Sequence, residues 1–313
     1  MTVWYNPTQD FVDNTLSYAW LFDQIFIVDN TEDDNSHLAA QIPNAIYIPN
    51  GKNLGIAKAL NQGIEAALIE NTKGRDYRWV MTMDQDSAWD KEQLTQYIAL
   101  CIEKSGEDAA IKSFSPSVVS PEVRYRHSTL GVWKRKIHKI ITKKNCKEKP
   151  RALPQSGFRD AVICSGNIID IAAWEDVGKF EEILFIDYVD IEFCYRLCEN
   201  GYKIFSFCQV SMQHNTDEHG PAKQPLFPDY IGHKMYKNGD PVRFFYVMRN
   251  YMYFRKCHPT GKTKTREKVF LERVLAHCVF NRKALRNIKV LIRAYKDYKE
   301  TLLPLIENER KKE

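Results

Sequence analysis

The chain has 313 residues, of which 44% are hydrophobic and 27% are charged. These values are typical of a globular protein and exclude a disordered, collagen-like or coiled-coil chain. No apolar run approaches the roughly 18 to 20 residues of a membrane-spanning helix, and the first residues lack the pattern of a secretory signal. The eight cysteines contain no C-x-x-C pair, which argues against a disulfide framework or a zinc cage. We therefore expect a cytoplasmic protein.

The net charge of +5 is unevenly distributed along the chain. Residues 255–313 contain seventeen Lys or Arg and seven Asp or Glu, so this segment carries +10 and the rest carries −5. A basic segment of this kind is typical of proteins that meet a polyanion. Three interpretations stay open: a solvated helical face, a helix on an anionic membrane surface, and a nucleic-acid site, the last without any accompanying motif. A second basic segment, 134–151, is predicted to be a solvated loop.

The first 115 residues alternate short apolar runs with helical patterns, as βαβ units on a largely parallel sheet do. We predict strands at residues 2–5, 24–28, 45–48 and 79–83. One helix is predicted from Gly55 onward, and a second is predicted to be capped by Asp90. Ligands of open α/β sheets bind beyond the carboxyl ends of the strands, so we expect a binding site where polar residues follow these strands. Those residues are Asn6, Asp29, Asn50 and Asp84.

The middle and the end of the chain are less regular. Order is predicted to return at 161–164, and a short helix is predicted around Trp174. A further helix should end at Asn200-Gly201, because glycine is a common signal after a helix C-terminus. A closing strand is predicted at 203–207, and residues 264–300 have the pattern of one or two long helices with many basic residues.

Asp84 and Asp86 follow the fourth predicted strand with one residue between them. Two carboxylates on a turn can converge on one hard divalent cation, although aspartate is also common in surface turns. His214, after the closing strand, would complete such a site as a third ligand, and a structural histidine is the alternative.

A second acidic group, Asp187, Asp190 and Glu192, lies where a helix is predicted to begin. Asp190 is therefore either an N-cap or a carboxylate that accepts a proton from an incoming hydroxyl group. The two roles are compatible, because a helix N-terminus favours the ionised carboxylate.

These residues belong to an ordered series of motifs that resembles the family 2 inverting glycosyltransferases. The motifs similar to the nucleotide-sugar half are Val3-x-Tyr5-Asn6-Pro7, Val28-Asp29-Asn30, Asn53-Leu54-Gly55-Ile56-Ala57-x-Ala59-x-Asn61-x-Gly63 and Met83-Asp84-x-Asp86-Ser87. Those similar to the rhamnosyltransferase-like branch are Ser165-Gly166-Asn167, Val177-Gly178-x-Phe180-Glu181, the run from Phe185 to Arg196, and His214. The series covers residues 3–214, and Tyr246-x-x-Arg249-Asn250 is a weaker match beyond it.

The resemblance implies an α/β protein with a GT-A fold, in which a Rossmann-like nucleotide-sugar domain has a mostly parallel central sheet. This domain would span residues 1–220, with the nucleotide-sugar half at 1–115 and the half for the acceptor and the catalytic base at 116–220. Residues 221–313 would form a C-terminal extension with basic amphipathic helices. The first strand is shorter than is typical of the family, which predicts a weakly held sheet edge or a truncated start.

The implied activity is metal-dependent, inverting transfer of a sugar from a nucleotide-diphosphate donor. The branch implies L-rhamnose from dTDP-rhamnose, with a UDP-hexose as the alternative donor. The acceptor would be a polyprenyl-diphosphate-linked glycan, a precursor of a cell-surface polysaccharide, at the anionic inner face of the cell membrane. No nucleic-acid partner is expected.

The resemblance also assigns residues by position. Asp84, Asp86 and His214 would hold the cation, Mn²⁺ or Mg²⁺. Asp190 would be the catalytic base, and because Val189 stands where many relatives have Glu, Asp187 and Glu192 are rivals. The donor would contact Tyr5, Asn6, Asp29, Asn53, Gly55, Asn61, Asp84, Ser165, Gly166 and Asn167. The acceptor or the membrane would contact Arg249, Asn250, Lys289 and Arg293.

Two other function classes are weighed against this one. A nucleotidyltransferase also places carboxylates and a cation at a sheet edge. It normally has a glycine-rich, basic loop after the first strand, whereas residues 6–10 of this chain are neither glycine-rich nor basic. A non-catalytic module that binds a nucleotide sugar or a lipid is the other alternative.

Overall fold

The computed structural model describes residues 1–119, 155–214, 240–259, 270, 274, 278 and 283–309. The chain divides into two compact units. The described residues of the first unit are 1–119 and 155–214, and the remaining described residues belong to the second. The predicted loop at 134–151 lies outside the described residues, and so does the part 264–282 of the predicted helical segment 264–300, apart from residues 270, 274 and 278. The predicted domain boundary at residue 220 also lies outside them and stays a prediction.

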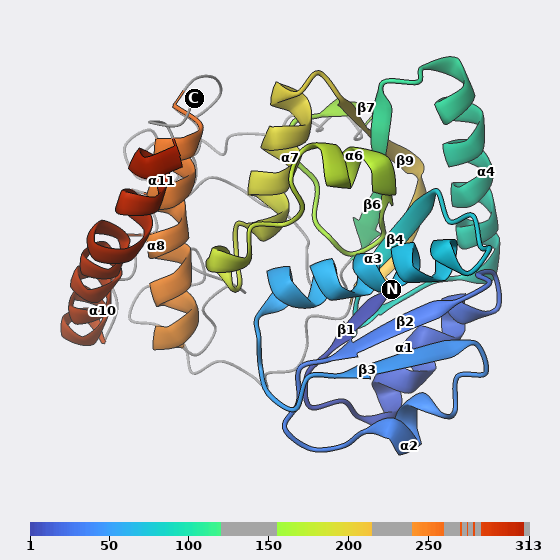
Figure 1. Cartoon of the computed structure of the whole chain (residues 1–313), viewed down its shortest axis with the longest axis horizontal. Coiled ribbons are helices and arrows are strands. Elements are labelled where there is room, and N and C mark those ends of the chain that lie inside the picture. Colours follow the sequence, from blue (N-terminus) through green and yellow to red (C-terminus); the bar gives the residue numbers. More distant parts are fainter. Residues whose placement is uncertain are drawn as a thin grey trace, which may run out of the picture. The chain divides into compact units, whose positions relative to one another are not determined.

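The first unit is built on a sheet with the strand order β3-β2-β1-β4-β8-β6-β9-β5, and β7 pairs with β9 (Figure 1). The strands β1 to β4 are all parallel to their neighbours within this group, whereas β8 joins β4 and β6 in antiparallel pairs. The α/β fold with a mostly parallel central sheet is thus confirmed. The strands are β1 Thr2–Trp4, β2 Ile25–Asp29, β3 Ala45–Pro49, β4 Trp79–Asp84, β5 Ser87–Ala88, β6 Ile111–Val119, β7 Gly157–Arg159, β8 Asn167–Asp170 and β9 Lys203–His214.

The short first strand is an interior strand and not an edge. β1 pairs with β2 on one side and with β4 on the other, and the side chain of Trp4 is fully buried. Burial of one large apolar side chain stabilises the folded state by about 1.5–3 kcal/mol. A strand of only three residues can therefore be held firmly when it lies between two other strands and its side chains are buried. The predicted weakly held edge is therefore wrong.

The helices of the first unit pack on this sheet. α3 contacts β1, β2 and β4, and α4 contacts β6 and β9. The predicted cap of α4 is confirmed, because the Asp90 carboxylate accepts hydrogen bonds from the backbone N–H groups of Glu92 and Gln93 at 3.1 and 3.2 Å. The helices are α1 Gln9–Ala19, α2 Ser36–Ala39, α3 Ile56–Thr72, α4 Lys91–Glu107, α6 Ile171–Asp176 and α7 Val189–Glu199.

The loops that follow the parallel strands are tied to one another. The side chain of Asn30, after β2, donates to the carbonyl of Gly55 at 3.1 Å, and Asn50, after β3, donates to the side chain of Asn30 at 2.8 Å. Such mutual hydrogen bonds satisfy polar groups that would otherwise be costly to bury. The polar residues predicted beyond the strands therefore lie at one sheet edge, as the parallel order requires.

The second unit contains α8 Pro241–Cys257, α10 Ala284–Asp297, a π-helical turn at Tyr298–Leu302, and α11 Leu303–Glu309. α8 begins at a proline that follows the capping residue Asp240, whose carboxylate accepts a hydrogen bond from the N–H of Val242 at 2.8 Å. α10 packs along α8. In the part of the chain that the structure describes, no helix combines the length and the apolar character needed to cross a membrane.

Candidate functional site

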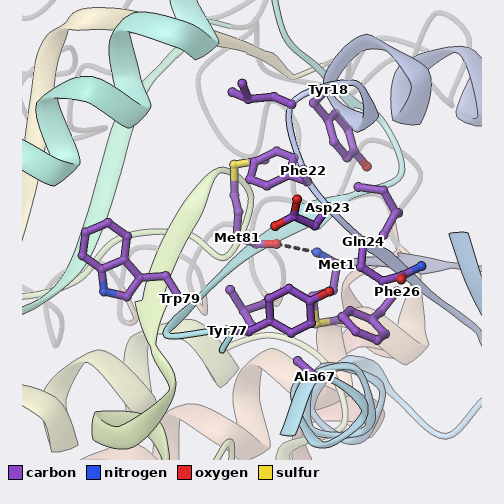
Figure 2. A pocket seen from close by; sticks show the side chains of 13 residues that line it. Met1, Tyr18, Phe22, Asp23, Gln24, Phe26, Ala67, Tyr77, Trp79 and Met81 are labelled. Carbon is purple, nitrogen blue, oxygen red and sulfur yellow. Dashed lines mark hydrogen bonds between the residues drawn. The ribbon is translucent and has the colours of Figure 1, made fainter. Parts of the chain in front are cut away.

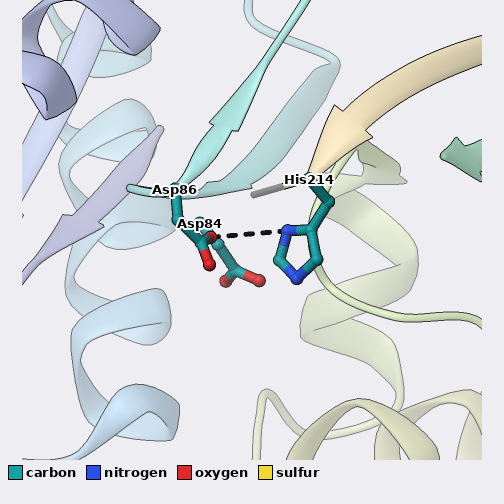
Figure 3. A group of neighbouring side chains, drawn as sticks. All are labelled: Asp84, Asp86 and His214. Atoms are coloured by element: carbon teal, nitrogen blue, oxygen red, sulfur yellow. Dashed lines mark ion pairs between the residues drawn. The ribbon is translucent and has the colours of Figure 1, made fainter. Parts of the chain in front are cut away.

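Asp84, Asp86 and His214 come together beyond the carboxyl end of β4. β4 ends at Asp84, and β5 pairs with the end of β9 so that Ser87 lies opposite His214. One ligand atom of each of the three half-buried side chains lies within 4.8 Å of the others, and Nδ1 of His214 is 3.4 Å from Oδ1 of Asp86. Figure 3 shows both carboxylates turned toward the imidazole ring. Two carboxylates and an imidazole are a donor set that fits a divalent cation.

Asp190 lies in the first turn of α7, within electrostatic reach of this cluster. Burial, with smaller contributions from the negative charges of Asp187 and Asp84, raises the pKa of the Asp190 carboxyl group to about 6. The backbone N–H of Ile191 opposes this by donating a 2.8 Å hydrogen bond to Oδ1. Asp190 is not the N-cap, which is Tyr188. A carboxyl group with this pKa is ionised at neutral pH and is still basic enough to accept a proton.

The rival Glu192 is engaged in a buried ion pair. Its side chain is 2% exposed and binds Nε and Nη2 of Arg196 at 2.6 and 2.7 Å. Arg196 also donates to the backbone carbonyls of Val177 and Lys179, at 2.6 Å each. Glu192 therefore orients Arg196, which ties α7 to the segment before it, and Asp187 and Asp190 are the other candidates for the base.

The loop that leads into α7 is strained. Phe185, Asp187 and Tyr188 have positive φ angles of 61°, 64° and 68°, which non-glycine residues rarely adopt. The N–H of Ile186 donates to the carbonyl of Leu184 at 2.7 Å, so Phe185 is the central residue of a γ-turn with positive φ. Strained backbone of this kind persists only where surrounding contacts enforce it, and it clusters at functional sites.

Gly55 and Asn61, both predicted to contact the donor, lie against the segment that precedes α7. The backbone N–H of Ile56 donates to the carbonyl of Phe185 at 2.6 Å, directly beside Gly55. Asn61 is 1% exposed, and its side chain donates to the carbonyl of Phe180 and accepts from the N–H of Phe180, at 2.9 Å each. Their direct contact with a donor stays a prediction.

The other predicted donor residues of the first half divide into buried and accessible ones. Asp29 is 1% exposed, and its carboxylate accepts hydrogen bonds from Thr31, from Asn35 at 2.8 Å and from the hydroxyl group of Tyr47 at 2.8 Å. Sequence reasoning missed these three partners, because they follow the motif at irregular spacings. The exposed residues are Tyr5, Asn6 and Asn53.

Ser165, Gly166 and Asn167 form a buried turn next to the acidic pair. The N–H of Gly166 donates to the carbonyl of Thr82 at 2.8 Å, and the hydroxyl group of Tyr97 donates to the carbonyl of Gly166 at 2.9 Å. Gly166 has a φ of +76°, and a Cβ atom there would lie 2.9 Å from Sδ of Met212. The turn is thus fixed from several sides, and its assignment to donor binding stays a prediction.

Comparison with known proteins identifies the class of this site. Residues 6–163 match the family model described as "Glycosyl transferase family 2". The chain belongs to glycosyl transferase family 2. It is also 29% identical over 257 residues, 79% of this chain and 75% of the relative, to a protein named dTDP-rhamnosyl transferase RfbF from Shigella flexneri. The predicted family and the enzyme class are therefore confirmed.

Solved structures support the fold of this glycosyltransferase. The chain resembles the crystal structure of residues 1–349 of TarS from S. aureus, with a TM-score of 0.51 and 14% identity. The match covers 98% of this chain and 82% of that one. The GT-A fold predicted from the motifs is confirmed.

A cavity of about 160 Å³ in this glycosyltransferase lies at the amino ends of the strands, away from the acidic cluster. Figure 2 shows Tyr18, Phe22 and Trp79 among its lining side chains, with the α-amino group of Met1 donating to the carbonyl of Met81 at 2.6 Å. Burial lowers the pKa of this amino group to about 5. None of the predicted site residues lines the cavity.

The four residues predicted to meet the acceptor or the membrane lie in the second unit. Arg249 is 8% exposed and Asn250 is fully buried. Arg249 pairs with Asp297 at 3.3 Å and so joins α8 to α10. Lys289 and Arg293 are exposed on α10. The role of all four stays a prediction, and their burial favours a structural role for Arg249 and Asn250.

Proposed function

We propose that the protein transfers L-rhamnose from dTDP-rhamnose, with inversion at the anomeric carbon, to a lipid-linked precursor of a cell-surface polysaccharide. The observation that carries this proposal is the cluster of Asp84, Asp86 and His214, in which Asp84 acts electrostatically on Asp190. The name of the relative from Shigella flexneri supports the choice of donor. Family membership favours this activity over nucleotidyl transfer and over binding without catalysis.

The reaction needs one proton acceptor and one site for the donor's diphosphate. The oxygen of an acceptor hydroxyl group bonds to the anomeric carbon while the bond from that carbon to the diphosphate oxygen breaks. Asp190 takes the hydroxyl proton on its carboxylate, and attack from the face opposite the diphosphate inverts the configuration. A divalent cation, Mn²⁺ or Mg²⁺, held by Asp84, Asp86 and His214, supplies positive charge for the departing diphosphate.

The proposed acceptor is a polyprenyl-diphosphate-linked glycan, which places the enzyme on the inner face of the cell membrane. Support comes from α10, on which four apolar side chains are exposed along one stripe: Leu285, Ile288, Ile292 and Tyr295. Exposed basic residues, including Lys289 and Lys296, flank the stripe. An apolar stripe beside basic residues is typical of helices that lie on an anionic membrane surface.

The test is a screen of nucleotide sugars with the full chain, a synthetic polyprenyl-diphosphate glycan and either Mn²⁺ or Mg²⁺. We expect turnover with dTDP-rhamnose, loss of turnover in chelator, and a product whose anomeric configuration is opposite to that of the donor by NMR. Turnover only with a UDP-hexose would replace the donor assignment and keep the family chemistry. Turnover that is unchanged in chelator would contradict the role of the cation.

A further inference from the structure

Two buried serines connect two of the three proposed cation ligands. Oγ of Ser165 accepts a 3.1 Å hydrogen bond from the backbone N–H of Asp84 and is hydrogen-bonded to Oγ of Ser87 at 2.7 Å, a pair in which either hydroxyl group can donate. Oγ of Ser87 in turn lies 2.7 Å from Nδ1 of His214. Both serines are fully buried. A continuous chain of hydrogen bonds therefore runs from Asp84 to His214.

The surroundings of His214 bear on which ring nitrogen faces a cation. A neutral imidazole carries a proton on one nitrogen and a lone pair on the other, and only the lone pair binds a metal. Nδ1 is 2.7 Å from the Ser87 hydroxyl group and 3.4 Å from the carboxylate of Asp86. A hydroxyl group donates or accepts, whereas an ionised carboxylate only accepts, so this pair of neighbours favours a proton on Nδ1.

We propose that Ser87 and Ser165 are positioning residues of the cation site, which keep the proton of His214 on Nδ1 so that Nε2 is the ligand. In this arrangement Nδ1–H donates to Ser87, the Ser87 hydroxyl donates to Ser165, and Ser165 still accepts from the N–H of Asp84. The Ser165 hydroxyl proton then faces Sδ of Met212, 4.0 Å away. This arrangement differs from the one with the proton on Nε2 only in the tautomer of His214 and in the rotation of the two hydroxyl groups. Both arrangements have the same net charge.

The buried turn at 165–167 is built to hold Ser165 in this place. Its amide and carbonyl groups are tied to Thr82 and Tyr97, and a side chain at Gly166 would collide with Met212 and Pro116. Ser87 is fixed by the strand pair β5–β9, which sets it opposite His214. Groups behind a metal ligand that fix its orientation and tautomer commonly change metal affinity. The Ser165-Gly166-Asn167 motif thus acquires a role that needs no contact with the donor.

The first experiment measures Mn²⁺ affinity without any donor, by calorimetry or by the EPR signal of free Mn²⁺. The variants are Ser87→Ala, Ser165→Ala and Ser87→Thr, and the matched control is Ser115→Ala, a serine on β6 that is 4% exposed. We expect the first two to bind Mn²⁺ about 10- to 100-fold more weakly. Ser87→Thr, which keeps the hydroxyl group, and Ser115→Ala should bind as the unchanged protein does. Equal affinity in folded Ser87→Ala and Ser165→Ala would overturn the proposal.

The second experiment determines the tautomer of His214 directly in the unchanged protein. Two-bond ¹H–¹⁵N NMR spectra of the full chain with saturating Mg²⁺ report the tautomer of each histidine, and His214→Gln assigns the signal. A proton on Nδ1 supports the proposal, and a proton on Nε2 overturns it. The proposed function is tested separately from this inference, which rests on its cation site. If the protein binds Mn²⁺ in this serine-dependent way but transfers no sugar, the inference about the cation site holds and the proposed rhamnosyl transfer is rejected.

Discussion

Gly55 and Phe185 touch at a distance that leaves no room for a side chain on the glycine. A Cβ atom at Gly55 would lie 2.6 Å from Cδ2 of Phe185 and 2.8 Å from its carbonyl oxygen. Gly55 also has a φ of +85°, which an L-residue rarely adopts. This contact joins the start of α3 to the strained loop before α7, and through that loop to Asp190.

Gly55→Ala should therefore damage both stability and catalysis. We expect the free energy of unfolding to fall by about 1–3 kcal/mol or more, because the substitution adds backbone strain and a collision. Gly51→Ala is the control, since Gly51 has a φ of +61° but a Cβ atom there would meet nothing within 4 Å. Urea denaturation and the turnover of the folded fraction measure the difference. Equal losses in the two variants would show that the contact with Phe185 is unimportant.

Asp190→Asn should separate catalysis from binding. We expect kcat to fall by about 100- to 10,000-fold while the affinity for Mn²⁺ is kept, because amide nitrogen and oxygen do not accept a proton as a carboxylate does. In the unchanged protein kcat/KM should fall as the pH falls through about 6, where the Asp190 carboxyl group becomes protonated. A pH profile that stays flat down to pH 5 would rule Asp190 out as the base.

The same substitution should raise stability at neutral pH. The pKa of Asp190 is raised in the folded protein from 3.8 to about 6, so the folded state binds the proton more tightly than the unfolded state does. Stability from this group is therefore fully present below pH 3.8 and is lost as the pH rises through about 6. The asparagine side chain never ionises and avoids that loss. Thermal melting at pH 7.5 should show a higher midpoint for the variant than for the unchanged protein, and a lower one would contradict the burial of the charge.

Glu192→Gln should act on folding and not on the proton transfer. The substitution removes the negative charge that faces Arg196, and loss of one partner of a largely buried ion pair costs up to about 3–5 kcal/mol. Denaturation should show this loss, whereas the folded fraction should keep the pH profile of the unchanged protein. A shifted pH profile with normal stability would instead make Glu192 the base.

Charged substitutions on α10 should weaken attachment to anionic vesicles. Leu285 and Ile292 are 79% and 61% exposed, so Leu285→Glu and Ile292→Glu should fold normally and lose binding by about tenfold each. Val242→Glu is the control, because Val242 is 59% exposed on α8 and lies outside the stripe. Flotation with vesicles of phosphatidylglycerol and phosphatidylcholine measures the effect. Undiminished flotation of both α10 variants would reject the membrane surface on α10.

The parallel half of the sheet was predictable because the evidence for it is local. Short apolar runs followed by polar residues mark each strand and its carboxyl end, and the parallel order then brings Asp29, Asn50 and Asp84 to one edge. The cap at Asp90 needs no distant partner and was predicted correctly. β9 extends beyond the predicted strand as far as His214, because its second half is stabilised by pairing with β5 and β6 and not by its own pattern.

The features that sequence reasoning missed depend on distant contacts. The left-handed backbone at Phe185 has no sequence signal, since glycine or asparagine would normally mark it. The i,i+4 spacing of Glu192 and Arg196 indicates an ion pair. The sequence alone could not decide between this ion pair and a catalytic base, because that choice depends on the burial of Glu192, which only the structure shows. Ser87 was interpreted as part of a motif, and its place behind His214 became visible only from the strand register.

The pairing of Ser87 with His214 joins positions 127 residues apart in the chain. Asp84, Asp86 and His214 come together only when β5 has paired with the end of β9. If these side chains bind Mn²⁺ as proposed, the relaxation signal of the bound ion would report the formation of this strand pair during refolding.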